Sequence, residues 1–210
     1  MGIATPPSYS SGQPASEHPA RWKFGYPIFH AETREQWRAW LEVNHAVAKG
    51  VWLCSWRSSD RARCAYPDVV AEAICFGWID STVNVLDDDR ALQLLTPRRA
   101  KSPWTRLNRQ RFADMEAAGL MTDAGRHTAD QAKASGWWTV YDPVEDLLEP
   151  LDLSAALDAS ASARRAWERF PPSARKQMLW WIISAARADT RAQRIATTVS
   201  KASIGERARG

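Results

Sequence analysis

The stretch that decides the fold runs from residue 66 to residue 96 and reads YPDVVAEAICFGWIDSTVNVLDDDRALQLLT. Pro67 suits the first turn of a helix, and Gly77 stands where a helix C-cap is expected. Residues 78–86 and 91–96 are rich in strand-forming side chains and are separated by an Asp-rich segment of turn composition. The stretch therefore predicts a helix followed directly by a β-hairpin.

The flanking sequence extends this pattern on both sides. Thr33 begins a predicted helix that ends at Gly50, and residues 51–56 read as a short strand. Downstream, Ser102 before Pro103 predicts the start of the next helix. A further helix is predicted to begin at Thr122 and end at Gly136, and the sequence after residue 153 carries helical signals alone.

The fold class predicted from these elements is α+β: a small antiparallel sheet of about three strands packed with helices, followed by a C-terminal helical region. Residues 1–25 are predicted to be a flexible leader because their Pro, Ser, Gly and Ala content buries little. We place the α+β domain at residues 26–140 and a basic helical region at residues 141–210.

Composition narrows the class of protein. The chain has 210 residues, of which 45% are hydrophobic and 25% charged. No apolar run approaches the roughly 20 residues that cross a bilayer, so no membrane insertion is expected. The three cysteines lack metal-ligand or disulfide spacing, which favours a reducing cytoplasm and predicts no metal. No glycine-rich phosphate loop is present either, and we expect no cofactor.

Charge is unevenly distributed along the chain. From Ser162 to the end there are 11 Lys and Arg against 3 Asp and Glu, a net charge of +8. Such a tail is compatible with nucleic-acid binding, although no DNA-binding motif accompanies it and a solvated helical surface is the simpler interpretation. The chain is also rich in tryptophan, with 12 residues that suit either a core or the wall of a ligand pocket.

A candidate anion site follows the predicted hairpin. Arg98 and Arg99 come directly after its second strand, and Ser102 precedes the open end of the next helix. Guanidinium groups and helix N-termini both favour carboxylate or phosphate groups, and Asn108 could add an amide contact. The predicted ligand is an anionic small molecule.

Three further residues complete the candidate ligand-binding set: Trp78, Asp80 and Trp104. Alternation along a strand puts Trp78 and Asp80 on one face, where they would form either a pocket or a satisfied polar core. In the alternative interpretation Arg99 pairs with Asp80 while Arg98 is solvated, and the cluster only fixes the hairpin. Both interpretations stay open at this point.

Three ordered strings in the sequence also resemble the YdeI/OmpD-associated family: Ala73–Asp80, Thr96–Arg99 and Ser102–Asn108. Weaker markers extend the resemblance from about Phe29 to Gly205, including Gly119–Thr122 and Asp189–Arg191. The resemblance implies a protein concerned with stress, bacteriocin protection and antimicrobial resistance, and it implies no catalytic residues.

The sequence thus favours a binding protein over an enzyme. Two alternatives remain: an enzyme acting on an anionic substrate in the same tryptophan-lined pocket, and a nucleic-acid-binding protein that uses the basic C-terminal helices. No pattern in the sequence predicts an oligomeric state.

Overall fold

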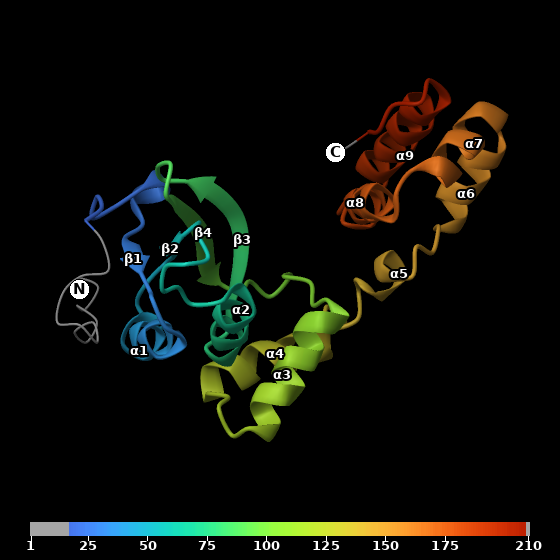
Figure 1. The fold of residues 1–210 in the computed structure, drawn as a ribbon. Coiled ribbons are helices and arrows are strands. Elements are labelled where there is room, and N and C mark those ends of the chain that lie inside the picture. The colour runs from blue at the N-terminus through green and yellow to red at the C-terminus, as the bar shows by residue number, and fades with distance from the viewer. Residues whose placement is uncertain (1–16, 209–210) are drawn as a thin grey trace. The chain divides into compact units, whose positions relative to one another are not determined.

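The computed structural model describes residues 17–208, which form two compact units. The N-terminal unit extends to Trp138, and the C-terminal unit begins at Thr139. Figure 1 shows a sheet with helices in the first unit and helices alone in the second. The α+β class is confirmed. Most of the predicted leader, residues 1–16, lies outside the described residues.

The N-terminal unit is built on a four-stranded sheet with the order β1-β2-β4-β3. The strands β2, β4 and β3 pair antiparallel, whereas β1 pairs parallel with β2. Their bounds are β1 Ile28–His30, β2 Val51–Trp56, β3 Trp78–Val85 and β4 Arg90–Pro97.

The expectation of about three antiparallel strands is therefore wrong by one strand. The additional strand, β1, has three residues, all buried, so it shows no alternation of apolar and polar side chains that a sequence pattern could detect. It joins the sheet through helix α1, Arg34–Asn44, which makes the crossover that a parallel connection needs. The sheet is mixed as a result.

Helix α2, Tyr66–Cys75, packs with α1 against one face of the sheet (Figure 1). Trp37 and Trp40 of α1 stack with ring centroids 5.4 Å apart, and Trp78 meets Trp40 edge-on at 5.7 Å. All three rings are at most 2% exposed. The tryptophans named here belong to the core, because a large apolar ring gains most where it is fully covered.

The other face of the sheet carries a smaller apolar cluster. Side chains of Trp52 and Leu92 pack there against Trp22 and Tyr26, from the segment before β1. A short 3-10 turn, η1 Lys23–Gly25, lies in that segment, and the Lys23 carbonyl accepts a hydrogen bond from Trp52 Nε1 at 2.9 Å. Trp22, Lys23 and Tyr26 thus contact the sheet.

Helices α3, Arg106–Ala117, and α4, Asp123–Ser135, complete the N-terminal unit. The prediction that α3 begins at Ser102 and Pro103 is wrong by one turn. Thr105 is the N-cap, and its hydroxyl accepts from the Asn108 N–H at 3.1 Å. Residues 102–105 lie outside the helix, and Trp104 among them packs in the core, where it is 1% exposed.

Helix α4 begins at the predicted residue, Thr122, whose hydroxyl accepts from the Gly125 N–H. The same hydroxyl donates to the carbonyl of Cys75 at the end of α2. A Cβ built at Gly125 would lie 2.3 Å from that carbonyl oxygen, so only glycine lets the two helices approach this closely.

The C-terminal unit is a helical bundle with its own apolar core, which includes Leu153, Trp167 and Leu179. The bounds of its helices are α5 Asp142–Glu145, α6 Leu151–Asp158, α7 Ala161–Arg169, α8 Pro172–Ile183 and α9 Ala188–Ser203. Glu149 links the segment before α6 to α7: it accepts hydrogen bonds from Arg164 and from Trp167 Nε1, both at 2.7 Å.

Among the residues that the structure describes, no helix combines the length and the apolar character needed to cross a membrane.

Candidate functional site

Four of the seven residues predicted as a ligand site are buried or already hydrogen-bonded within the protein. Trp78 and Trp104 are each 1% exposed, and Trp78 Nε1 donates to the carbonyl of His45 at 3.3 Å. The backbone N–H of Asn108 donates to the N-cap hydroxyl of Thr105, and its side-chain oxygen accepts a hydrogen bond from Arg111 at 2.9 Å. Asp80 accepts a hydrogen bond from the Tyr66 hydroxyl at 2.7 Å.

Arg98 is the predicted residue with the most unusual environment. Its guanidinium lies 3.9 Å from the centroid of the Trp104 ring, and Nη1 donates to the carbonyl of Pro103. Nε and Nη2 are buried and have no hydrogen-bond partner among the described residues. Burial lowers the pKa of Arg98 to about 10, while nearby Asp80 acts to raise it. The charge is retained at neutral pH.

Arg99 and Ser102 lie elsewhere, on the face of the sheet opposite helices α1 and α2. Both line a cavity of about 460 Å³ there, together with Tyr26 and Leu94. The Ser102 hydroxyl accepts from the Arg99 backbone N–H at 3.1 Å, which closes a turn and leaves the Arg99 side chain exposed. The seven predicted residues therefore do not surround one cavity.

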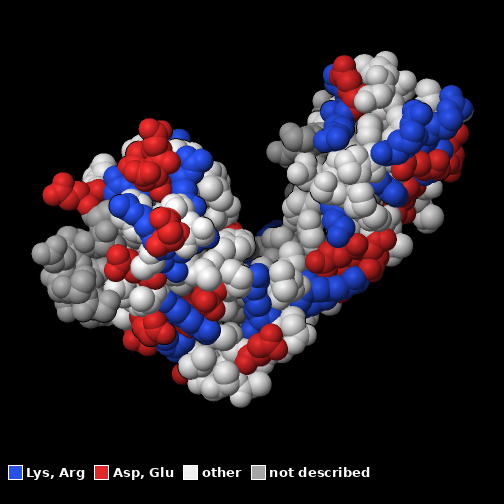
Figure 2. Space-filling model, in the orientation of Figure 1, with Lys and Arg blue, Asp and Glu red and all other residues white. Residues whose placement is uncertain are grey.

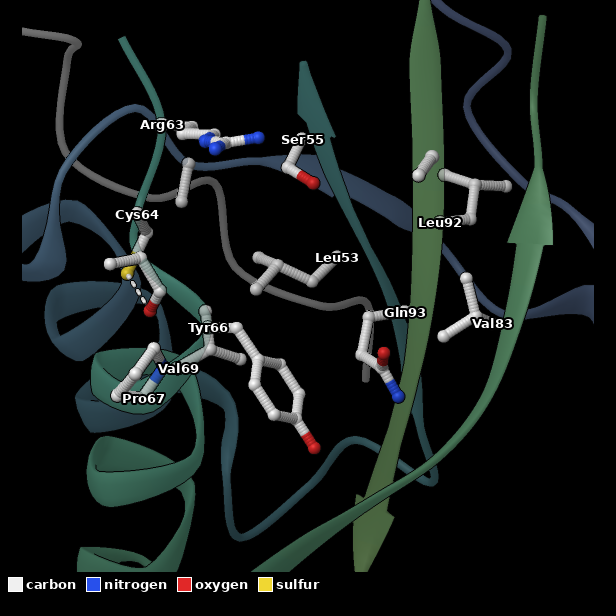
Figure 3. A pocket seen from close by; sticks show the side chains of 13 residues that line it. Leu53, Ser55, Arg63, Cys64, Tyr66, Pro67, Val69, Val83, Leu92 and Gln93 are labelled. Atoms are coloured by element: carbon white, nitrogen blue, oxygen red, sulfur yellow. Dashed lines mark hydrogen bonds between the residues drawn. The ribbon is translucent and has the colours of Figure 1, made fainter. Parts of the chain in front are cut away.

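A different cavity lies on the helix-covered face, where α2 begins. It has a volume of about 410 Å³ and 13 lining residues, and we call it the sheet pocket. In Figure 3, Arg63 and Ser55 stand at one end, the hydroxyl of Tyr66 and the amide of Gln93 at the other, and Leu53 between them. An apolar middle with polar groups at both ends is typical of small-molecule sites of this size.

A β-bulge sets one wall of the sheet pocket. Asp80 pairs with Leu95 and Val83 pairs with Gln93, so β3 has one residue more than β4 over this interval. Without the additional residue, Val83 would face away from Asp80, because successive side chains alternate across a strand. The bulge turns Val83 toward the pocket, where its side chain is 63% exposed.

Tyr66 forms the opposite wall, and a hydrogen bond to Asp80 fixes its position. Its hydroxyl donates to Asp80, and burial, followed by the hydrogen bond to that carboxylate, raises the pKa of Tyr66 to about 12. The phenol stays protonated at neutral pH and its ring is a fixed surface. Of the predicted residues, Asp80 is thus linked to the sheet pocket through Tyr66.

The pocket contains a thiol, that of Cys64, which is buried. Burial raises its pKa to about 12, with Asp68 and Glu72 adding to the effect. Burial likewise raises the pKa of Cys75 to about 11, as expected for a core thiol. Among the described residues there is no group of three or more His, Cys, Asp or Glu placed to hold a metal ion.

Sequence patterns did not single out the residues of the sheet pocket. The weak signal was alternation on two strands: Leu53 is followed at the same face by Ser55, and Ala91 by Gln93. Each pair places a small or polar side chain where the α-helical layer would require an apolar one. The Arg-rich loop before α2 was a second signal, because it supplies Arg63.

Two comparisons found no match: no curated protein and no solved structure is similar enough to this chain to carry an argument. Residues 29–128 match a family described as a domain of unknown function, DUF8412. This range contains the sheet pocket and all seven predicted site residues.

Residues 147–205 match the family described as bacteriocin-protection, YdeI or OmpD-associated. The match includes the markers Asp189–Arg191 of the C-terminal unit, whereas the strings between Ala73 and Asn108 fall in the domain of unknown function. The C-terminal part of this chain is therefore similar to the bacteriocin-protection, YdeI or OmpD-associated family, and the predicted family resemblance is confirmed over residues 147–205.

Proposed function

We propose that the protein is a non-catalytic binding protein of the bacteriocin-protection type, whose N-terminal unit binds a small molecule in the sheet pocket. The observation that carries the proposal is the pocket itself: exposed apolar groups of Tyr66 and Val83 face one another over a floor that contains Leu53. Covering exposed apolar side chains with a ligand removes their surface from water, which favours binding. The family match of residues 147–205 supports the protective role.

Binding is favoured over covalent catalysis by the chemistry of the lining groups. The pocket's thiol, that of Cys64, is kept protonated by its raised pKa, and Tyr66 holds its proton for the same reason. Both groups are therefore protonated near neutral pH, which disfavours nucleophilic attack and proton abstraction. The enzyme alternative therefore has less support than binding.

We also propose a cytoplasmic location and a role in stress response. The location is supported by three cysteines that are free thiols, as a reducing compartment would keep them. Nucleic-acid binding by the C-terminal helices has less support, because Arg164, Arg175 and Arg191 are paired with Glu149 or Asp152. On the face drawn in Figure 2, acidic side chains lie among the basic ones over this unit.

The test begins with a variant that fills the sheet pocket, Ser55→Phe. Ser55 is half-buried on β2, and an aromatic residue suits a strand, so the fold should be kept. A thermal-shift screen of small metabolites with the full chain should find compounds that stabilise the wild type and fail to stabilise the variant. Compounds that stabilise both equally, with an unchanged circular dichroism spectrum, would place their binding outside this pocket.

The protective role is tested in cells. Wild type and Ser55→Phe are expressed to equal levels in a susceptible bacterial strain, which is then exposed to bacteriocins and cationic peptides. We expect improved survival with the wild type and a loss of that benefit with the variant. Equal survival with the wild type, the variant and the empty vector would refute the role.

A further inference from the structure

The sheet pocket is electrostatically one-sided. Among its 13 lining residues, all within the described part of the chain, Arg63 is the single charged one. Two carboxylates that adjoin or contact lining residues are already engaged: Asp68, next to Pro67, pairs with Arg34 at 3.2 Å, and Asp80 accepts a hydrogen bond from Tyr66. A ligand in this pocket therefore meets one positive charge that no lining carboxylate balances.

Arg63 is positioned by its own loop. Its Nη1 donates to the carbonyls of Trp56 and Arg57, at 3.3 and 3.2 Å. These two hydrogen bonds hold one edge of the guanidinium and direct the rest of the group along the end of the pocket toward Ser55 (Figure 3). A guanidinium that is held in this way matches a planar oxyanion such as carboxylate.

The opposite end offers neutral hydrogen-bonding groups. The Tyr66 hydroxyl donates its hydrogen bond to Asp80, so its oxygen can accept one from a ligand. The Gln93 side chain donates to the carbonyl of Ser81 at 3.2 Å, which leaves its amide oxygen as an acceptor. Leu53 lies between the two ends (Figure 3). Charge is thus expected at one end of the ligand and none at the other.

We infer that the ligand is an elongated, mainly apolar organic anion with one carboxylate or sulfonate group, which Arg63 binds. The inference rests on the proposed binding function. It has a direct consequence for that function: a cationic peptide is not the occupant of the sheet pocket, because Arg63 would repel it and no lining carboxylate would attract it. Protection would then act through the bound anion.

Two fluorescent probes of similar shape test the charge. 8-Anilinonaphthalene-1-sulfonate is an apolar anion, and N-phenyl-1-naphthylamine is its neutral counterpart. Each is titrated into the full chain as wild type, Arg63→Gln, Arg57→Gln and Ser55→Phe. Arg57→Gln is the matched control, because it removes the same charge from the same loop while Arg57 does not line the pocket.

We expect Arg63→Gln to weaken binding of the anionic probe by about fivefold or more and to leave the neutral probe unchanged. Arg57→Gln should alter neither probe by more than about twofold, since an exposed charge outside the pocket is screened by salt. Ser55→Phe should weaken both probes. An excess of a Lys-rich amphipathic peptide should not displace the anionic probe.

The contrary outcomes separate the two proposals. If Ser55→Phe weakens both probes but Arg63→Gln weakens neither, the pocket binds small molecules and the anionic class is wrong. Equal loss of the anionic probe in Arg63→Gln and Arg57→Gln would mean attraction to overall charge, which also overturns the inference. If Ser55→Phe affects neither probe, the sheet pocket is not their site, and the proposed function fails together with the inference.

Discussion

Glu72 provides the sharpest test of how the N-terminal unit is held together. Its side chain is 1% exposed and lies on α2, facing α1. It accepts from Arg34 Nε at 2.6 Å and from Arg38 Nη1 at 2.7 Å. We predict that Glu72→Gln, which keeps the shape and removes the charge, destabilises this unit substantially.

The magnitude follows from the burial of the three partners. Breaking a fully buried ion pair from one side costs about 3–5 kcal/mol. The side chains of Arg34 and Arg38 are 34% and 24% exposed, so water compensates part of the loss. We expect a decrease of about 2–3 kcal/mol in the free energy of unfolding. For a unit of this size, that lowers Tm by about 6–15 °C.

The assay is differential scanning calorimetry of the full chain, with wild type and variant measured in the same buffer. Arg126→Gln is the control, because it breaks a surface pair with Glu116 in the same unit and should cost less than about 1 kcal/mol. A Glu72→Gln variant that melts within 2 °C of this control would refute the reasoning. The buried carboxylate would then not be a main link between α1 and α2.

Three further predictions concern buried groups of the same unit. Burial lowers the pKa of His30 to about 4, so between pH 4 and 6.5 the unfolded chain binds a proton that the native chain does not. Stability should therefore fall by about 2 kcal/mol from pH 8 to pH 5 in urea titrations, and much less in His30→Gln. Gly125→Ala should reduce Tm far more than Gly136→Ala. A Cβ at Gly136 meets no atom within 4 Å, so that substitution is strained by the left-handed φ alone, at a cost of about 1 kcal/mol. Similar Tm values for the two variants would contradict the close approach of Gly125 to Cys75. The thiols of the three cysteines should react with a disulfide reagent at pH 8 only upon unfolding, because burial raises the pKa of each to about 11 or 12. Rapid labelling of the native chain would disprove their burial.

The amino-acid sequence by itself determined the features that depend on neighbouring residues. The caps at Thr33 and Thr122, the end of α2 at Gly77 and the hairpin of β3 and β4 all follow from local hydrogen bonding and backbone preference. These local elements were also enough to predict the α+β class, because their order limits how they can pack.

Tertiary structure alone decided where the candidate site lies. Arg98 looked available for an anion, but Trp104 packs beneath it and covers its guanidinium. Arg63 and Tyr66 are close together in the sequence, but they meet Val83 of β3 only because α2 leaves one end of the sheet uncovered and a bulge rotates β3. A pocket is what packing leaves unfilled, and this depends on contacts between distant residues, which no local pattern in the chain encodes.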